Sequence, residues 1–357
     1  MLSYHERLQG WNRDKNLLFL SLYLVFSFLF LKYPSFIKLL FLIPVLLYVY
    51  AFDINFSLVK KAVLLSITLW LITFVPLPKV ESTYPSLLNR YFSPHKHLIS
   101  FVKENYSEKS SELISLLLFN GGKDTSQYYK VFKDLGIAHL VCISGFHFSL
   151  ISKVIKTLFL GIRRIEKLLI PVVLVLWWSF ANYSIPGLRV LLEIFIPAKS
   201  RIRRWSASVL ISPVFNVEIY ASYSFLLSFF ISLLLILVKE YNCNSISKMM
   251  WAYLLIFIFT TLIFLPIHRK IHFLSFFNLS LFFPIVSALF VYCFLTFWCV
   301  PLSSGIEYMM HPFLFLLEKA RDNNKVFQVH EWGYDYSYFF LALFSIFLIM
   351  KHRRELY

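Results

Sequence analysis

The sequence has few charged residues, because only 15% of its 357 residues are Asp, Glu, Lys or Arg. A soluble domain usually has about 25%. Glycine is also scarce, with 9 residues against 40 Phe and 21 Tyr, and apolar residues reach 59%. These values exclude a disordered chain, a collagen-like chain and an ordinary soluble enzyme. We therefore expect a polytopic membrane protein.

Acidic residues are the scarcer of the two signs. The 19 Asp and Glu stand against 35 Lys and Arg, which leaves a formal net charge of +16. A membrane protein places such charge in loops, near lipid headgroups or polyanions. Composition alone does not separate a transporter, a membrane enzyme and a nucleic-acid pore.

Several chemical motifs are missing from the sequence. It has no P-loop, no dinucleotide-binding glycine pattern and no HExxH motif. The four cysteines show no CxxC spacing, so we expect small buried hydrophobes. With no complete catalytic or metal motif, we expect no enzyme, no metal site and no cofactor.

Runs free of Asp, Glu, Lys and Arg predict the membrane segments, because one span takes about 20 residues. We expect an all-α membrane bundle with about 9–11 membrane segments, some of them short or re-entrant. Leu168–Leu188 should begin a hairpin that bends near Asn182–Gly187. Pro284 and Pro301 should break the long run Phe273–Ile306. The runs are Asn16–Leu31, Leu39–Phe52, Ala62–Pro78, Leu135–Ser152, Leu168–Leu188, Ile219–Val238, Met249–Ile267, Phe273–Ile306 and Tyr336–Met350.

The cations gather between these runs, and we expect all of them except Arg189 in loops or at span edges. The cations form three groups, of which the first lies within residues 153–167 and the third closes the chain at its C-terminus. The second group, which we call the basic cluster, comprises Lys199, Arg201, Arg203 and Arg204. The positive-inside rule predicts that all three are cytoplasmic and that the chain is a multi-pass protein of the cell membrane.

The most informative segment runs from Phe132 to Ser149, where polar residues interrupt an apolar run. A metal site would need His139 and His147, yet eight helical positions leave them about 80° apart and more than ~10 Å along the axis. Ser144 and His147, at i and i+3, suit a nucleophile pair, although no acid lies nearby to orient it. Two further interpretations of this segment stay open. One is a polar lining or packing site, in which Gly145 allows close backbone approach, and the other is a contact to a proton or a phosphate.

Arg189 is the one cation deep in an apolar stretch, and Glu193 lies four residues later on the same helical face. One interpretation is a buried ion pair that holds the bundle together. The other is that Arg189 faces a polar cavity and meets a phosphate or another anion. Pro186-Gly187 should end one helix and start another, so free N–H groups would point into the same place.

The stretch from Gly136 to Ser149 closely resembles the signature of the ComEC-type competence membrane proteins. Its pattern is Gly-x-x-His-Leu-x-x-Ile-Ser-Gly-x-His, and the fixed positions match at Gly136, His139, Leu140, Ile143, Ser144, Gly145 and His147. Three later landmarks follow in the family's order. They are Ser184 to Arg189 with Pro186 and Gly187, Ser224 to Phe229 with Ser228, and Asn278 to Pro284.

The chain departs from the family's pattern at three places. Asn120-Gly-Gly-Lys-Asp124 stands where the family has Gly-Asp-Arg, and Leu226 stands where it has Gln. Glu193 stands where the residue is usually apolar, so it would neutralise Arg189.

The resemblance implies a domain division and a function. Residues 1–111 would hold N-terminal spans and a polar loop, 112–308 the competence (channel) domain, and 309–357 an amphipathic segment and the last span. The chain would conduct single-stranded DNA across the cytoplasmic membrane in natural transformation, with Arg189 and the basic cluster contacting the strand. Aromatic side chains would offer stacking surfaces for the bases.

The family's OB-like and metallo-β-lactamase-like domains are expected to be absent. We therefore expect as partners, besides the lipid bilayer and single-stranded DNA, a separate DNA receptor, a cytoplasmic motor ATPase and a separate nuclease. A homo-oligomer is a further hypothesis. Two alternative functions stay open, a secondary transporter of a small anion that uses Arg189 and the broken helix, and a degenerate pore that conducts nothing.

Overall fold

We describe the fold from a computed structural model of the chain, which divides into two compact units. Unit 1 comprises residues 1–80, 195–269 and 329–357, and unit 2 comprises residues 81–194 and 270–328. The structure describes residues 4–31, 49, 54, 57–60, 62–64, 94–122, 126–159, 162–214, 222–240, 244–268, 270–272, 274–324, 326–328 and 337–355. The predicted segments Leu39–Phe52 and Ala62–Pro78 lie mostly outside these residues.

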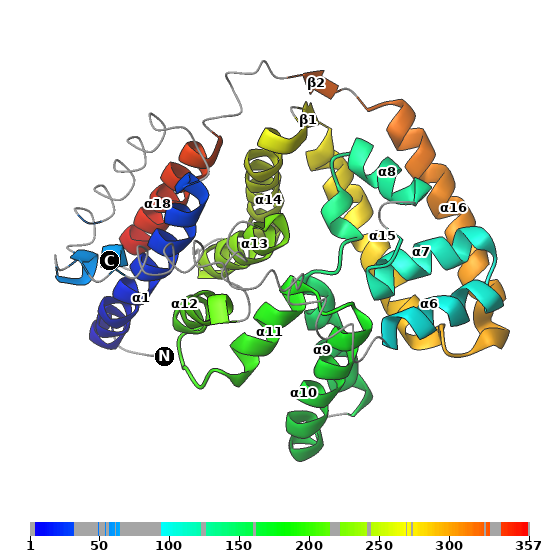
Figure 1. Ribbon diagram of the computed structural model, residues 1–357, viewed down its shortest axis with the longest axis horizontal. Coiled ribbons are helices and arrows are strands. Elements are labelled where there is room, and N and C mark those ends of the chain that lie inside the picture. Colours follow the sequence, from blue (N-terminus) through cyan, green and yellow to red (C-terminus); the bar gives the residue numbers. More distant parts are fainter. Residues whose placement is uncertain are drawn as a thin grey trace, which may run out of the picture. The chain divides into compact units, whose positions relative to one another are not determined.

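Unit 1 is a bundle of apolar helices in which α13 and α14 lie side by side and α18 packs against both (Figure 1). Its helices are α1 (Tyr4–Leu31), α12 (Arg201–Ile211), α13 (Tyr223–Glu240), α14 (Ser245–His268) and α18 (Ser337–Glu355), with a short 3-10 turn at Ser212–Val214. Trp205 is buried and donates from Nε1 to the carbonyl of Phe229 at 2.9 Å, which ties α12 to α13. The stacked rings of Phe225 and Phe229, 4.0 Å apart, fill the space beneath.

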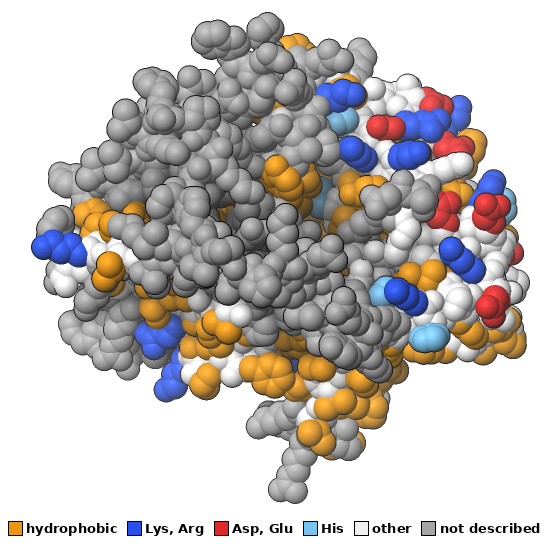
Figure 2. Space-filling model, in the orientation of Figure 1, with side chains coloured by type: hydrophobic (Ala, Val, Ile, Leu, Met, Phe, Trp, Pro, Cys, Tyr) orange, Lys and Arg blue, Asp and Glu red, His pale blue; other side chains and the backbone are white. Residues whose placement is uncertain are grey.

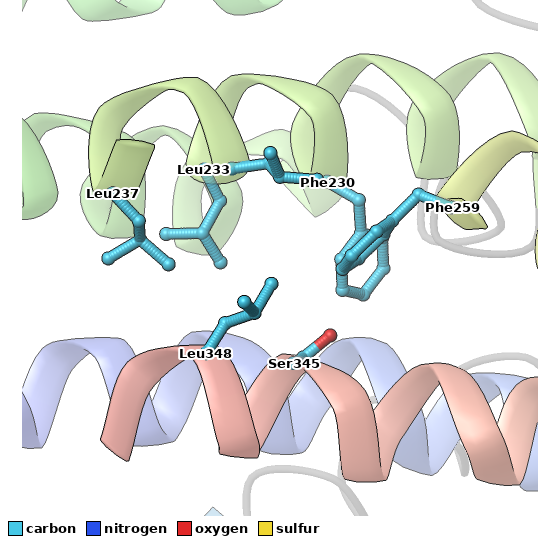
Figure 3. A pocket seen from close by; sticks show the side chains of 7 residues that line it. Phe230, Leu233, Leu237, Phe259, Ser345 and Leu348 are labelled. Atoms are coloured by element: carbon cyan, nitrogen blue, oxygen red, sulfur yellow. The ribbon is translucent and has the colours of Figure 1, made fainter. Parts of the chain in front are cut away.

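A small apolar gap remains between α13, α14 and α18 (Figure 3). Phe230, Leu233, Phe259 and Leu348 line it from three helices. The one polar side chain there, Ser345, donates its hydroxyl to the Leu341 carbonyl of its own helix at 2.7 Å. The gap therefore offers no polar group to orient a ligand.

Unit 2 holds the signature segment. Its helices are α6 (Pro94–Asn105), α7 (Glu108–Phe119), α8 (Gln127–Asp134), α9 (Gly145–Leu158), α10 (Arg163–Phe180), α11 (Ile185–Phe195, whose last residue belongs to unit 1), α15 (Ser275–Thr296) and α16 (Ser303–Asp322). Short 3-10 turns lie at Ala138–Leu140 and Val300–Leu302. The strands β1 (Lys270–His272) and β2 (Val326–Gln328) form an antiparallel ribbon in which Ile271 pairs with Phe327.

The all-α prediction is confirmed, since the described chain is helical apart from this ribbon. Among the described residues, three stretches are long and apolar enough to cross a membrane, namely Ala138–Leu158, Ile246–Leu265 and Ser275–Thr296. Shorter apolar helices lie at Leu168–Phe180, Tyr223–Lys239 and Phe340–Met350. The count of about 9–11 segments and the multi-pass topology stay predictions.

Two helices of unit 2 expose apolar side chains along one face. On α10 these are Leu168, Val172, Val175 and Leu176, and on α15 they include Phe277 and Leu281. The spacing of three to four residues places each set on a single stripe. Such stripes would be costly in water and suit contact with hydrocarbon.

The helix breaks differ from the prediction in one position. Pro284 lies inside the continuous helix α15, so the expected break there is wrong. Apolar membrane helices tolerate an internal proline because neighbouring groups satisfy the freed carbonyl. The expected break at Pro301 is confirmed, because this residue lies in the 3-10 turn between α15 and α16.

The cations of unit 2 also differ from the prediction of loops and span edges. Lys103, Lys109 and Lys130 lie on helices α6, α7 and α8, in the region expected to be a polar loop and just after it. Figure 2 shows Lys and Arg mixed with Asp and Glu over the part of unit 2 that holds these helices and α16. A surface of mixed sign marks a water-exposed region and is not a patch for a polyanion.

Candidate functional site: the junction of Gly145 and Arg189

The signature begins with a turn that only glycine fits. Gly136 has φ +73°, and a Cβ there would lie 2.8 Å from the Cβ atoms of His272 and Ser275. Asn278, from α15, donates its Nδ2 to the carbonyl of Leu135 at 3.3 Å. The resemblance marked Gly136 as a signature position and Asn278 as a later landmark, and the structure brings both to the start of the segment.

His272 belongs to the ribbon next to this turn. Its Nδ1 lies 3.3 Å from Nδ2 of Asn324, which also donates to the carbonyl of Asp134. Burial lowers the pKa of His272, while the contact with Asp134 opposes this shift. Folding therefore favours the neutral ring of His272.

Ser144 and His147 form a helix cap at the N-terminus of α9. The backbone N–H of Ser144 donates to Nδ1 of His147 at 3.0 Å, and the Ser144 Oγ lies at the same distance from Nδ1. Because a backbone N–H can only donate, Nδ1 is an acceptor and the ring proton sits on Nε2. His147 is buried, with its ring centroid 4.5 Å from that of Phe290. The predicted contact is present, and it is a capping box.

His139 and His147 do not share one helix, contrary to our assumption. His139 lies in the 3-10 turn Ala138–Leu140, and α9 starts only at Gly145. The Nε2 of His139 is buried without a partner among the described residues. Within the described part of the chain, no group of three His, Cys, Asp or Glu side chains is arranged to hold a metal ion.

Arg189 lies on α11 and forms an ion pair with Glu193, with Nη1 2.7 Å from Oε1. The exposed fractions of the two side chains are 9% and 25%. On its other side the guanidinium rests on Gly145, where an added Cβ would collide with Nη2. The structure therefore shows the ion pair of the first interpretation and places the guanidinium against the N-terminus of α9, while the anion contact of the second interpretation stays a prediction.

The turn before α11 positions this arginine. Asn182 and Tyr183 have positive φ angles of 53° and 50°, so the bend falls where it was predicted. The carbonyl of Ser184 accepts bonds from Trp178 Nε1 at 2.9 Å and from Leu188 N at 3.0 Å, and its buried hydroxyl has no partner among the described residues.

Pro186 lies in the first turn of α11, where its missing N–H costs nothing. A Cβ on the next residue, Gly187, would collide with Phe148 of α9 and lie 2.5 Å from Trp178 of α10. Gly187 therefore lets three helices meet closely beside Arg189.

The basic cluster lies at the start of α12 in unit 1. Arg203 donates from Nε at 2.9 Å and from Nη2 at 2.7 Å to Oδ1 of Asp14, a carboxylate of α1 that is only 5% exposed. No sequence pattern indicated this partner, because 189 residues separate the two. Lys199 and Arg201 are exposed and Arg204 is half-buried, with no acid in the first turn of α12. The remaining predicted position, Ser228, is half-buried on α13.

The helical fold and its apolar stripes define a membrane protein built of helices, and unit 2 holds an ion pair between the buried Arg189 and the partly exposed Glu193. A family model described as "Competence protein" matches residues 117–354, which is more than half of the chain. The chain therefore belongs to the competence protein family, and it serves competence, the uptake of DNA. No curated protein and no solved structure matches it. The division at residues 111 and 308 and the roles of the site residues stay predictions.

Proposed function

We propose that the chain conducts single-stranded DNA across the cytoplasmic membrane in natural transformation. Family membership supports the process, and one observation supports the route. This observation is the guanidinium of Arg189 lying against Gly145, at the N-terminus of α9.

Two positive poles meet at this junction. The N-terminus of a helix carries about half a positive charge, and its first N–H groups have no acceptor within the helix. A cation beside it is electrostatically unfavourable unless a nearby anion neutralises the charge, as Glu193 does here. A phosphate fits such a place, because helix N-termini and arginine both bind its oxygens. Single-stranded DNA presents one phosphate per nucleotide.

The proposed partners follow from what a conducting pore needs. Single-stranded DNA would be delivered by a separate receptor, pulled by a cytoplasmic motor ATPase and degraded, where it is degraded, by a separate nuclease. The exposed Lys199 and Arg201 of the basic cluster would contact the strand or lipid headgroups on the cytoplasmic side.

The test is complementation in a transformable host that lacks the gene. Wild-type protein should restore the uptake of fluorescent DNA, and Arg189→Ala should reduce it at least about tenfold, because one buried charged contact is worth about 1.5–3 kcal/mol. Arg189→Lys should give an intermediate value, since lysine lacks the fork that holds a phosphate in two places. Unchanged uptake in the deletion strain, or in Arg189→Ala, would contradict the proposal.

The main alternative is a transporter of a small anion, which the same buried Arg189 and helix N-terminus would suit. Arg189→Ala weakens both functions, so salt separates them. Strand binding falls steeply with ionic strength, while one buried site for a small anion responds little. A degenerate pore would bind the strand and leave uptake unrestored.

A further inference from the structure

Arg189 and Glu193 are unequal members of their ion pair. The Nη1–Oε1 distance is 2.7 Å, and the carboxylate side chain is 25% exposed against 9% for the arginine. Glu193 is therefore the more exposed member of the pair, and Arg189 is the more deeply buried one.

The helix itself does little to hold the carboxylate. An acid N-terminal to a base at i and i+4 is the more favourable order, and here the arginine comes first. Glu193 also lies in the last turn of α11, which ends at Phe195, and a helix C-terminus disfavours negative charge. The pair is thus held by the need of a buried guanidinium for an anion. A carboxylate and a phosphate meet that need through the same two-pronged geometry.

We propose that Glu193 is a specificity-determining residue that fills the anion position of Arg189 in the empty protein and yields it only to a strand phosphate. This inference rests on the proposed function of Arg189. A free phosphate ion would have to displace the tethered carboxylate alone. A strand held by other cations presents its phosphate at a high effective concentration, so it succeeds where the free ion fails. Glu193 thereby keeps small anions out of a site meant for a polyanion.

The experiment uses the full chain in lipid nanodiscs and a fluorescein-labelled oligothymidylate, with inorganic phosphate as competitor. Glu193→Gln keeps the shape and removes the charge. It should bind the strand about three- to fivefold more tightly, as expected for loss of one competing ion pair. Strand binding should also become sensitive to millimolar phosphate, which the wild type resists. Glu166→Gln is the matched control, because Glu166 lies in the first turn of the neighbouring α10 and its loss changes the net charge equally. It should bind like the wild type.

The outcomes separate the inference from the proposed function. If Arg189→Ala binds the strand as well as the wild type, the proposed function is wrong. If Arg189→Ala weakens binding while Glu193→Gln leaves it unchanged or weaker, only the inference is wrong, and Glu193 holds the guanidinium in position. In the Arg189→Ala background, Glu193→Gln should give no gain.

A second variant covers the case in which Glu193→Gln fails to fold, as judged by helicity and thermal unfolding. Glu193→Asp keeps the charge and withdraws it by one methylene group. It should also bind more tightly than the wild type, by a smaller factor, and equal or weaker binding would overturn the inference.

Discussion

Gly145 determines where the charge of Arg189 lies. A Cβ at this position would collide with Nη2 of Arg189 and lie 3.3 Å from Cγ2 of Val190. Nη2 is the far end of a flexible side chain, so it can move aside without disturbing the helices. Gly145→Ala should therefore fold, and because Gly145 is the first residue of α9 the change should affect stability little. It should still move the guanidinium off the N-terminus of α9 and lower DNA uptake as far as Arg189→Ala does.

Gly187→Ala is the control for this prediction. There the new methyl group meets the ring of the buried Phe148 and that of Trp178, which is held by its hydrogen bond to the Ser184 carbonyl. Overpacking of this kind costs about 1–3 kcal/mol, so Gly187→Ala should lower the unfolding temperature while Gly145→Ala does not. Full uptake by Gly145→Ala would show that the position of the guanidinium is unimportant.

The residue-level predictions succeeded where the partners are close in sequence. The i, i+4 spacing gave the pair of Arg189 and Glu193, and the i, i+3 spacing gave the contact of Ser144 and His147. The purpose of the second contact was missed, because a capping box usually has Glu or Gln at its third helical position. The partner of Arg203 was out of reach for a different reason. Asp14 comes to it only through the packing of α1 on α12.

At the scale of elements, variants in the cap of α9 distinguish a structural role of Ser144 from a catalytic one. Ser144→Ala removes the hydroxyl contact but keeps the backbone bond to His147, so it should cost about 1 kcal/mol of stability. DNA uptake should persist, because α9 still begins at the same residue. A hydrolase with a Ser144 nucleophile would lose all function in this variant.

His147 provides the matching pair of variants. His147→Gln places the usual capping-box residue at the third position and should keep most of the stability. His147→Ala leaves the N–H of Ser144 without its acceptor and should cost about 1–3 kcal/mol, measured by thermal unfolding. Equal stability of the two variants would contradict the capping role.

Element boundaries were predictable where a special backbone is needed and less so elsewhere. The bend before α11 was found, because Pro186-Gly187 signals a helix start. Proline alone misled at Pro284, since an apolar surrounding lets α15 continue through it. Helix α6 and the start of α7 lie in the stretch that was taken for a polar loop, because α6 has few apolar residues and several charged ones. These helices are stabilised by packing within unit 2, and such packing cannot be predicted from a local sequence pattern.

At the scale of the whole molecule, the boundaries of the family match and those of the two units fall at different places in the chain. The match over residues 117–354 includes parts of both units, and each unit is built from separate stretches of sequence. The sequence identified the class, because the composition is read from the whole chain and the signature from one local segment, Gly136 to Ser149. It did not predict the units, which arise from contacts between distant stretches such as α1 with α12 and α14 with α18.

The net charge leads to a prediction about the salt dependence of strand binding. Each phosphate contact to a single strand contributes about −0.7 to the slope of log K against log salt. If the whole excess of +16 met the strand, the slope would be about −11.

Many cations instead share their surface with acids, as on α6 to α8, and Arg203 is engaged by Asp14. If the strand contacts only Arg189 and the basic-cluster residues Lys199, Arg201 and Arg204, as proposed, four contacts give a slope of about −3. Arg189→Ala should make it shallower by about 0.7, while Lys103→Ala, on the mixed surface of α6, should leave it unchanged. Fluorescence anisotropy of a labelled oligothymidylate across a salt series measures the slopes of the wild type and of the two variants. A slope near zero would favour the small-anion transporter, and one near −11 would show that diffuse charge binds the strand without a defined site.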